Sequence, residues 1–275
     1  MAVDFLKTLQ AYYEEAALRY EAIEPAFGPL AACLVRFARL RPDERVIDLG
    51  TGSGLAARLA AQKGCRVCGL DFSWQMLHIA RRKGLSALVQ GDMHRLPLRA
   101  GCFDVALAAF AFNSTDPTFS LREAQRVLKP TGRLALVEWG HTDALSQLLY
   151  DTLEEYQVEE PPPQLAARRA ERQRPHPWDA LEGLDDLRAA LAQAGFARVR
   201  IRAVTVTVRF EDVKDFIRYK LAWPSRHAEV EAMPYEVRTL FLSDLLENLS
   251  LHTNDAGYLI WQPEIVLVRA IKPAP

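Results

Sequence analysis

The sequence has little cysteine, no excess of charge of either sign and no long apolar run. Four of its 275 residues are cysteine, and 34 basic residues stand against 35 acidic ones. This balance argues against a general nucleic-acid binder, which needs a basic surface, and favours small, roughly neutral partners. No stretch approaches the length of a bilayer-crossing helix. The amino terminus lacks a basic segment followed by an apolar core, so we expect a cytoplasmic protein.

Two of the cysteines, Cys65 and Cys68, form a C-x-x-C, a spacing also found in redox and zinc sites. Here the pair lies in residues 65–71, whose pattern predicts a strand. Residues three apart in a strand are separated by about 10 Å, which is too far for a disulfide. No second C-x-x-C and no close pair of histidines completes a metal site. We therefore expect buried or half-buried thiols and no bound metal.

A regular alternation of strand and helix patterns occupies the first half of the chain. The strand-like segments are 45–49, 66–71, 86–90, 104–110 and 133–138. Helical patterns separate most of them, and this order predicts a parallel α/β sheet. We assign residues 43–140 to this core. Residues 1–42 are predicted to form a cap of two helices, with a break between Pro25 and Pro29.

The second half of the chain has a different pattern. Residues 141–195 predict a charged helical connector, within which the arginine-rich segment 168–178 is either a small basic patch or, more simply, a solvated connector. Residues 196–275 predict the last two strands of the core, the first over 197–209. The residues between these strands, 211–262, predict a helical insertion, and a connection of that length usually covers a site. We expect it to cover the side of a pocket on which an acceptor substrate binds.

A glycine-rich turn in residues 46–54 is the strongest local signal. A short apolar strand ends at Asp48, and Gly50, Thr51, Gly52 and Gly54 follow. Glycine adopts positive φ readily and lets a ligand lie against the backbone, while the N–H groups of the helix that follows would face that ligand. The dinucleotide fingerprint G-x-G-x-x-G needs a glycine where Leu55 stands, so the loop does not match that fingerprint. A tight turn without a ligand is the alternative interpretation.

Acidic side chains follow two further strands. Asp71 ends the second strand, and Asp92 with Met93 follows the third. In an open parallel sheet, ligands bind beyond the carboxyl ends of the strands. Asp71 could accept hydrogen bonds from ribose hydroxyls, and Asp92 from an adenine amino group, with Met93 covering the ring. A charge at a helix N-terminus and a plain turn are the structural alternatives.

In order and spacing, these motifs resemble the class I S-adenosylmethionine-dependent methyltransferases, nearest to the small-molecule branch that includes quinone-biosynthesis C-methyltransferases. The resemblance rests on the segments 46–54, 69–73, 91–93, 103–105 and 121–130. It implies an α/β fold with a doubly wound, seven-stranded, mostly parallel sheet of the Rossmann-like methyltransferase kind, whose last strand is antiparallel. It also implies S-adenosyl-L-methionine as the cofactor.

The resemblance further implies a role for each motif. Asp48 and the glycine loop would hold the methionine part of the cofactor, and Asp71 the ribose. Asp92 and Met93 would hold the adenine, to whose amino group Ala109 would offer its backbone carbonyl. Tyr20 would close over the cofactor. The implied cofactor-binding residues are Tyr20, Asp48, Gly50, Thr51, Gly52, Gly54, Asp71, Phe72, Asp92, Met93 and Ala109.

The leading hypothesis is an enzyme that transfers the sulfonium methyl group to a small-molecule acceptor by in-line displacement, chiefly through alignment of the reactants. Glu138 and His141 follow the fifth strand and are candidate bases by position, although a structural role is the simpler interpretation, so no catalytic residue is assigned. A non-catalytic S-adenosylmethionine-binding module is the alternative. An NAD-dependent oxidoreductase and an RNA methyltransferase, the latter resting on residues 168–174, are less favoured.

Overall fold

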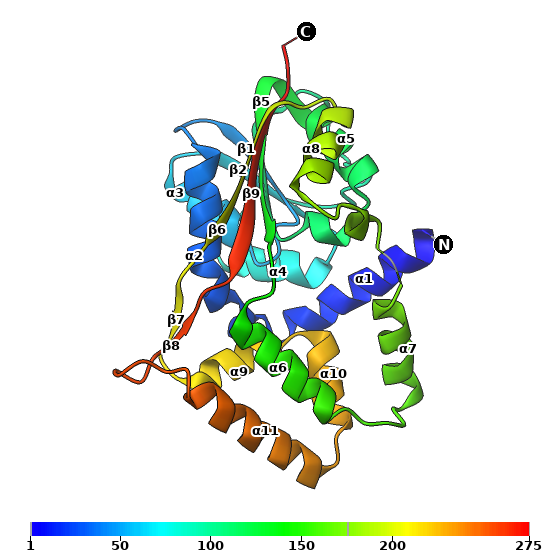
Figure 1. Ribbon diagram of the computed structural model, residues 1–275. Coiled ribbons are helices and arrows are strands. Elements are labelled where there is room, and N and C mark those ends of the chain that lie inside the picture. The colour runs from blue at the N-terminus through cyan, green and yellow to red at the C-terminus, as the bar shows by residue number, and fades with distance from the viewer. Residues whose placement is uncertain (1, 175, 275) are drawn as a thin grey trace.

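A seven-stranded sheet is the centre of the fold in the computed structural model, which describes residues 2–174 and 176–274 (Figure 1). Its strand order is β3-β2-β1-β4-β5-β9-β6. Neighbours among β1 to β5 are parallel, whereas β9 is antiparallel to both β5 and β6. The predicted doubly wound, mostly parallel sheet with an antiparallel last strand is confirmed. The strands are β1 Arg45–Leu49, β2 Arg66–Asp71, β3 Leu88–Gln90, β4 Phe103–Ala109, β5 Leu128–Trp139, β6 Ala197–Thr205 and β9 Glu264–Ile271.

Helices cover both faces of this sheet, so its central strands are apolar on both sides. Alternate residues of β5 show the arrangement: Ala135 and Val137 belong to the core beneath α2, and Leu134 and Leu136 to the core beneath α5 and α8. These helices, with the others of the sheet region, are α1 Ala2–Ala17, α2 Tyr20–Ala38, α3 Leu55–Gln62, α4 Trp74–Arg82, α5 Pro117–Val127 and α8 Leu184–Gln193.

The predicted break in the amino-terminal helices is wrong. α2 continues through Pro25 and Pro29, and the two helices are separated at residues 18–19 instead. Proline removes one backbone donor from a helix, which usually ends or kinks it. In α2 the apolar side chains of Ile23 and Leu30 are fully buried against the sheet. Tertiary packing therefore outweighs the local preference.

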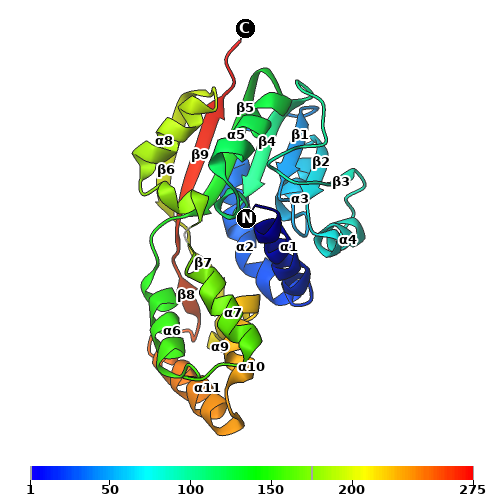
Figure 2. The same cartoon turned by 90° about the vertical axis from the view of Figure 1, so that its right-hand side faces the viewer.

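The remaining helices form a second group below the sheet (Figures 1 and 2). The strand expected over residues 197–209 is divided: β6 ends at Thr205, and β7 joins β8 in a separate two-stranded sheet. The elements of this lower group are α6 Ala144–Glu155, α7 Pro163–Arg172, β7 Val208–Phe210, α9 Val213–Leu221, α10 Pro224–Ala232, α11 Tyr235–Ser250 and β8 Leu259–Trp261. The chain thus places three helices between β6 and β9.

The arginine-rich segment begins in α7, and two of its arginines pair with acids of neighbouring helices. Arg168 bonds to Glu15 at 2.6 Å, and Arg169 to Glu229 at 2.6 Å. Glu229 is almost fully buried, at 2% exposure. Acids from α1 and α10 therefore neutralise two of the four arginines of this segment, and Arg174 pairs with Glu171 of α7 itself.

Candidate functional site

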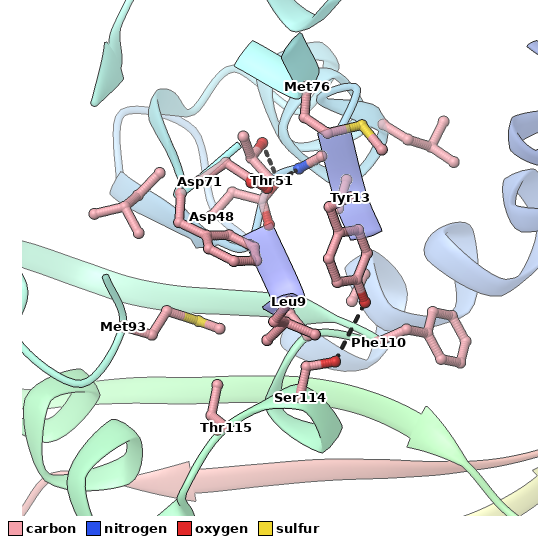
Figure 3. A pocket seen from close by; sticks show the side chains of 18 of the residues that line it. Leu9, Tyr13, Asp48, Thr51, Asp71, Met76, Met93, Phe110, Ser114 and Thr115 are labelled. Atoms are coloured by element: carbon pink, nitrogen blue, oxygen red, sulfur yellow. Dashed lines mark hydrogen bonds between the residues drawn. The ribbon is translucent and has the colours of Figure 1, made fainter. Parts of the chain in front are cut away.

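A pocket opens at the carboxyl ends of the parallel strands, between the glycine loop and helices α1 and α2 (Figure 3). Loops that follow β1, β2, β3 and β4 contribute to its wall, together with residues of both helices. The structure brings ten of the eleven predicted residues to this one wall: Tyr20, Asp48, Gly50, Thr51, Gly52, Asp71, Phe72, Asp92, Met93 and Ala109. Gly54 is the predicted residue that does not line it.

The three glycines of the loop have positive φ, 67° for Gly50, 53° for Gly52 and 81° for Gly54. They differ in what a side chain would meet. A Cβ on Gly52 would have only the Tyr20 hydroxyl near it, at 3.5 Å, so Gly52 borders open space. A Cβ on Gly54 would lie 2.3 Å from Leu85 Cδ1. Gly54 therefore allows α3 to pack closely, while Gly52 keeps the backbone open to a ligand.

Asp48 is a buried carboxylate with one unused oxygen. Its side chain lines the pocket and the residue is 1% exposed. Oδ2 accepts hydrogen bonds from Thr51 Oγ1 at 2.7 Å and Ala57 N at 3.1 Å. Oδ1 has no partner among the described residues. Burial raises the pKa of Asp48 to about 7. A donor or cation from a ligand would satisfy Oδ1 and favour the ionised form.

Asp71 connects the glycine loop to the start of α4. Its Oδ2 accepts from Gly52 N at 2.8 Å, and its Oδ1 accepts from Ser73 N at 2.9 Å. Burial nevertheless raises the pKa of Asp71 to about 6. Each carboxylate oxygen has two lone pairs, so each can accept a further bond from a hydroxyl at the pocket wall. Asp71 therefore both shapes the loop and leaves acceptors for a ligand diol.

Asp92 is part of a chain of hydrogen bonds at the pocket rim. Its Oδ1 accepts from His94 N at 2.9 Å and contacts His94 Nδ1 at 2.8 Å. His94 Nε2 accepts from Asp116 N at 2.8 Å, which assigns the ring proton to Nδ1. Burial opposes ionisation of Asp92, but the bonds from His94 prevail and lower its pKa. The loops after β3 and β4 are thereby connected.

Helix α1 closes the pocket from outside the sheet. Tyr13 Oη and Ser114 Oγ lie 3.2 Å apart, as the dashed line in Figure 3 marks, and Gln10 Nε2 donates to the carbonyl of Phe72 at 3.2 Å. Burial raises the pKa of the hydroxyls of both Tyr13 and Tyr20, so both are neutral hydrogen-bond donors at ordinary pH. These contacts make α1 part of the site.

The pocket changes character toward the lower group of helices, where aromatic rings replace carboxylates. Phe27, Phe110 and Trp223 line this side. Phe110 stacks on Trp139 with ring centroids 4.2 Å apart, and Phe27 meets Phe110 edge to face at 5.1 Å. Phe110 has a φ of 55°, an uncommon value for a bulky residue, which turns the chain at the end of β4. This side suits a flat or apolar molecule.

Neither positional candidate for a base lines the pocket. Glu138 is buried at 3% exposure, and its Oε1 accepts from Phe112 N at 2.8 Å. This bond holds the loop after β4. Burial raises the pKa of Glu138 to about 8, so the carboxyl group is mostly protonated at neutral pH. The side chain of His141 is 95% exposed and contacts Glu264 at 2.7 Å.

Sequence reasoning missed the pocket residues that come from outside the strand-end motifs. Leu9 and Tyr13 on α1, Ser114 after β4 and Trp223 before α10 carry no motif, and only the tertiary fold brings them together. His94 carried a signal, since it stands two residues after Asp92 in the same loop. Among residues 2–174 and 176–274, no group of three His, Cys, Asp or Glu side chains could hold a metal ion.

The pocket geometry fits an adenosyl ligand with a cationic tail. The unused Asp48 oxygen suits an ammonium group, the free lone pairs of Asp71 suit a ribose diol, and Met93 can cover a base. The sulfonium carries a further positive charge that a wall of carboxylates tolerates. These matches rest on this chain's own atoms.

Comparisons with known proteins agree with this geometry. Residues 47–136 match the family model described as methyltransferase domain. Curated relatives named demethylmenaquinone methyltransferase include one from Thermotoga maritima, 42% identical over 99 residues that cover 34% of this chain and 43% of that protein. Another, from Tropheryma whipplei (strain Twist), is 34% identical over 144 residues that cover 50% of this chain and 58% of that protein. The chain thus spans about half the length of the curated relatives it matches.

A solved structure of similar fold is phosphoethanolamine N-methyltransferase 2 of Haemonchus contortus, in complex with phosphomonomethylethanolamine and S-adenosylhomocysteine. It superposes with a TM-score of 0.59 at 18% identity, over 98% of this chain and 59% of that one. This likeness shows the fold. The match of residues 47–136 to the methyltransferase domain model, and the curated relatives, agree with the resemblance seen in the sequence.

Proposed function

We propose that the protein binds S-adenosyl-L-methionine in this pocket and transfers its methyl group to a small-molecule acceptor. The observation that carries the proposal is the convergence of Asp48, Asp71 and Asp92 on one wall beside an open glycine loop. The acceptor nucleophile forms a bond to the methyl carbon as the carbon–sulfur bond breaks. S-Adenosylhomocysteine leaves, and the acceptor gives up a proton to solvent or a base. The protein contributes alignment of the three atoms in line.

The acceptor we propose is a flat, partly apolar molecule of the quinol type. Two observations support this class. The side of the pocket away from the carboxylates is formed by Phe27, Phe110 and Trp223, and aromatic rings favour stacking on flat ligands. The matched relatives are named demethylmenaquinone methyltransferases. The helical insertion 211–262 contributes Trp223 to the pocket lining, and we propose that it covers the acceptor.

The rival functions make different demands on the site. A non-catalytic binding module would bind the cofactor and transfer nothing. An NAD-dependent oxidoreductase needs the third fingerprint glycine, where Leu55 stands. An RNA methyltransferase needs a free basic surface near the pocket, but Arg168 and Arg169 are paired with Glu15 and Glu229.

The test is methyl transfer measured with methyl-labelled S-adenosylmethionine, first with reduced demethylmenaquinone and then with a total metabolite extract. We expect labelled product from the first acceptor, identified by mass spectrometry. Transfer only from the extract would keep the methyltransferase and replace the acceptor. Tight cofactor binding with no transfer to either would favour the binding module, and a preference for NAD in calorimetric titration would contradict the proposal.

A variant pair connects the activity to the pocket. Asp71→Ala should weaken cofactor binding by about 1.5 to 3 kcal/mol, the usual range for hydrogen bonds to a charged group. The matched control is Asp151→Ala, which removes an exposed acid on α6 away from the pocket lining. Equal affinity in the two variants would remove Asp71 from the proposed site.

A further inference from the structure

A second hollow lies along α2, where the helix borders β6 and β9. Phe27 and Ala31 of α2 line the strand-end pocket, whereas Ala32, Cys33 and Arg36 line this second groove. Figure 1 shows α2 running beside the two strands that form the groove's floor. Its volume is about 660 Å³, which is within the range of about 300 to 1,000 Å³ typical of small-molecule sites.

Five arginines converge on this groove from three elements, and we call it the arginine groove. They are Arg36 and Arg39 at the end of α2, Arg200 and Arg202 on β6, and Arg269 on β9. Arg200 and Arg202 are two residues apart on one strand, so they share a face of the sheet. Arg269 is the direct cross-strand partner of Arg200 in the antiparallel register.

Among the described residues, these positive charges have no carboxylate partner. In the described part of the chain, none of the five guanidinium groups forms an ion pair with a carboxylate. The acids of the adjoining hollow are occupied, because Glu44 pairs with Arg133 and Asp104 with Lys129. A concentration of like charge without partners favours binding of an anion.

Arg269 shows how the groove holds one of these charges. Its side chain is half-buried, donates to the carbonyl of Phe37 at 3.1 Å and lies 5.4 Å from the centre of the Phe37 ring. Burial lowers its pKa, and the positive charges of Arg39 and Arg200 lower it further. The guanidinium is thus kept in place in a position where its neighbours repel it.

The floor of the groove is partly apolar. Phe37, Val204 and Leu267 contribute carbon surface, and Thr205 and Thr207 belong to the same lining. Arginine binds phosphate through paired N–H donors, more specifically than a point charge does. The combination fits a ligand with a phosphate or diphosphate group and a carbon body. The limited volume and the overall net charge of -1 favour a small ligand over a nucleic acid.

We propose that the arginine groove binds a small phosphorylated compound, a phosphate ester or a diphosphate, at a site separate from the strand-end pocket. The group that is recognised is a phosphate, held by the guanidinium donors of Arg200, Arg202 and Arg269. Its source is either a soluble metabolite or a lipid headgroup.

The test is calorimetric titration of the full chain with inorganic pyrophosphate at low ionic strength. We expect saturable binding that weakens at least about tenfold in Arg200→Gln/Arg202→Gln, because charge-assisted hydrogen bonds are lost. The matched control is Arg81→Gln/Arg82→Gln, an equal change of charge at two exposed positions on α4. Its affinity should stay within about twofold of the parent, because α4 packs beside β2 and β3, at the opposite end of the sheet from β6.

Further measurements distinguish a soluble ligand from a lipid headgroup and test the proposal itself. Sedimentation with phosphatidylcholine vesicles, with and without phosphatidic acid, assigns a headgroup if the protein follows the acidic vesicles, and a soluble ligand if it does not. Absence of pyrophosphate binding, or equal loss in both double variants, would overturn the proposal. Tighter binding of single-stranded RNA, lost in the groove variant, would replace it. If Arg200→Gln/Arg202→Gln unfolds, Arg36→Gln, at an exposed helix position, takes its place.

Discussion

Two regions of this molecule bury ionisable groups, and they do so in different ways. In the strand-end wall of the pocket, Asp48 lines the cavity, and one of its buried carboxylate oxygens has no partner among the described residues. In the lower group of helices, Lys220 is 4% exposed and donates to Ser146 Oγ at 2.6 Å. Its Nζ lies 4.5 Å from the centre of the Trp261 ring, with Phe216 also close.

The pKa values shift strongly in both regions, but Asp48 lines the strand-end pocket and Lys220 does not. Burial raises the pKa of Asp48 to about 7 and lowers that of Lys220 to about 7. Lys220 is not part of the pocket lining, and aromatic rings surround its amine. A perturbed pKa therefore indicates a functional site only together with a cavity that holds the missing partner.

The largest expected effect tests whether the glycine loop is open to a ligand. Gly52→Val should weaken S-adenosylmethionine binding by about 1,000-fold, or roughly 4 kcal/mol, because the side chain would enter the pocket. The control is Gly84→Val, which has a φ of 97° and nothing within 4 Å of its Cβ position. Both should lose about 1 to 2 kcal/mol of stability from the left-handed backbone. Calorimetry compares them, and equal cofactor affinity would show that the loop does not contact the ligand.

The second prediction concerns the pH dependence of the strand-end wall. Because the folded-state pKa of Asp48 is raised from 3.8 to about 7, the native state holds a proton that the unfolded chain releases. The free energy of unfolding of the ligand-free protein should fall as pH rises from about 4 to 7. Asp48→Asn should reduce this fall, by on the order of 4 kcal/mol at most, while weakening cofactor binding. Denaturant titrations at several pH values measure it.

For this prediction Asp151→Asn, at an exposed position on α6, is the control and should leave the pH dependence as it is. If Asp48→Asn also leaves it unchanged, the carboxylate is ionised in the ligand-free fold, and the contrast with Lys220 is lost.

The third prediction has the opposite sign. The folded-state pKa of Lys220 is lowered from 10.5 to about 7, so the unfolded chain binds a proton that the native state lacks over this range. The free energy of unfolding should therefore rise with pH between about 7 and 10. Lys220→Met should remove up to about 4 kcal/mol of this rise. Lys214→Met, at an exposed position on the same helix, should not. A rise that persists in Lys220→Met has another origin.

The smallest effect concerns the aromatic side of the pocket. Trp223→Ala should raise the KM for the acceptor about fivefold, equivalent to roughly 1 kcal/mol, because one stacking surface is lost. Cofactor affinity should change little. Trp74→Ala, which removes a tryptophan that is 60% exposed and outside the pocket, is the control. A loss of cofactor affinity with an unchanged KM would place Trp223 on the donor side.

The sheet and the strand-end acids could be predicted because their signals are local. Asp48, Asp71 and Asp92 each lie within two residues of the end of a strand, and parallel strands bring their carboxyl ends to one edge of a sheet. The alternation of apolar strands with helices in the sequence predicts a parallel sheet and therefore this common edge. Ten of the predicted residues consequently share one pocket wall.

The rest depended on contacts between distant segments. The path of α2 through Pro25 follows from packing of its apolar face, which no local preference reveals. Tyr13 meets Ser114 across 101 residues of sequence. The arginine groove needs α2, β6 and β9 together, and its members look like ordinary solvated charges in the sequence.

The antiparallel position of β9 has a consequence for how such a fold can change. Because β9 lies between β5 and β6, residues 211–262 leave the sheet at one strand and return at its immediate neighbour. Closing a longer loop between fixed ends adds only about 0.6 kcal/mol for each doubling of its length. The segment can therefore be lengthened, shortened or exchanged without shifting the register of the sheet. One donor-binding scaffold can in this way be fitted to acceptors of different shape.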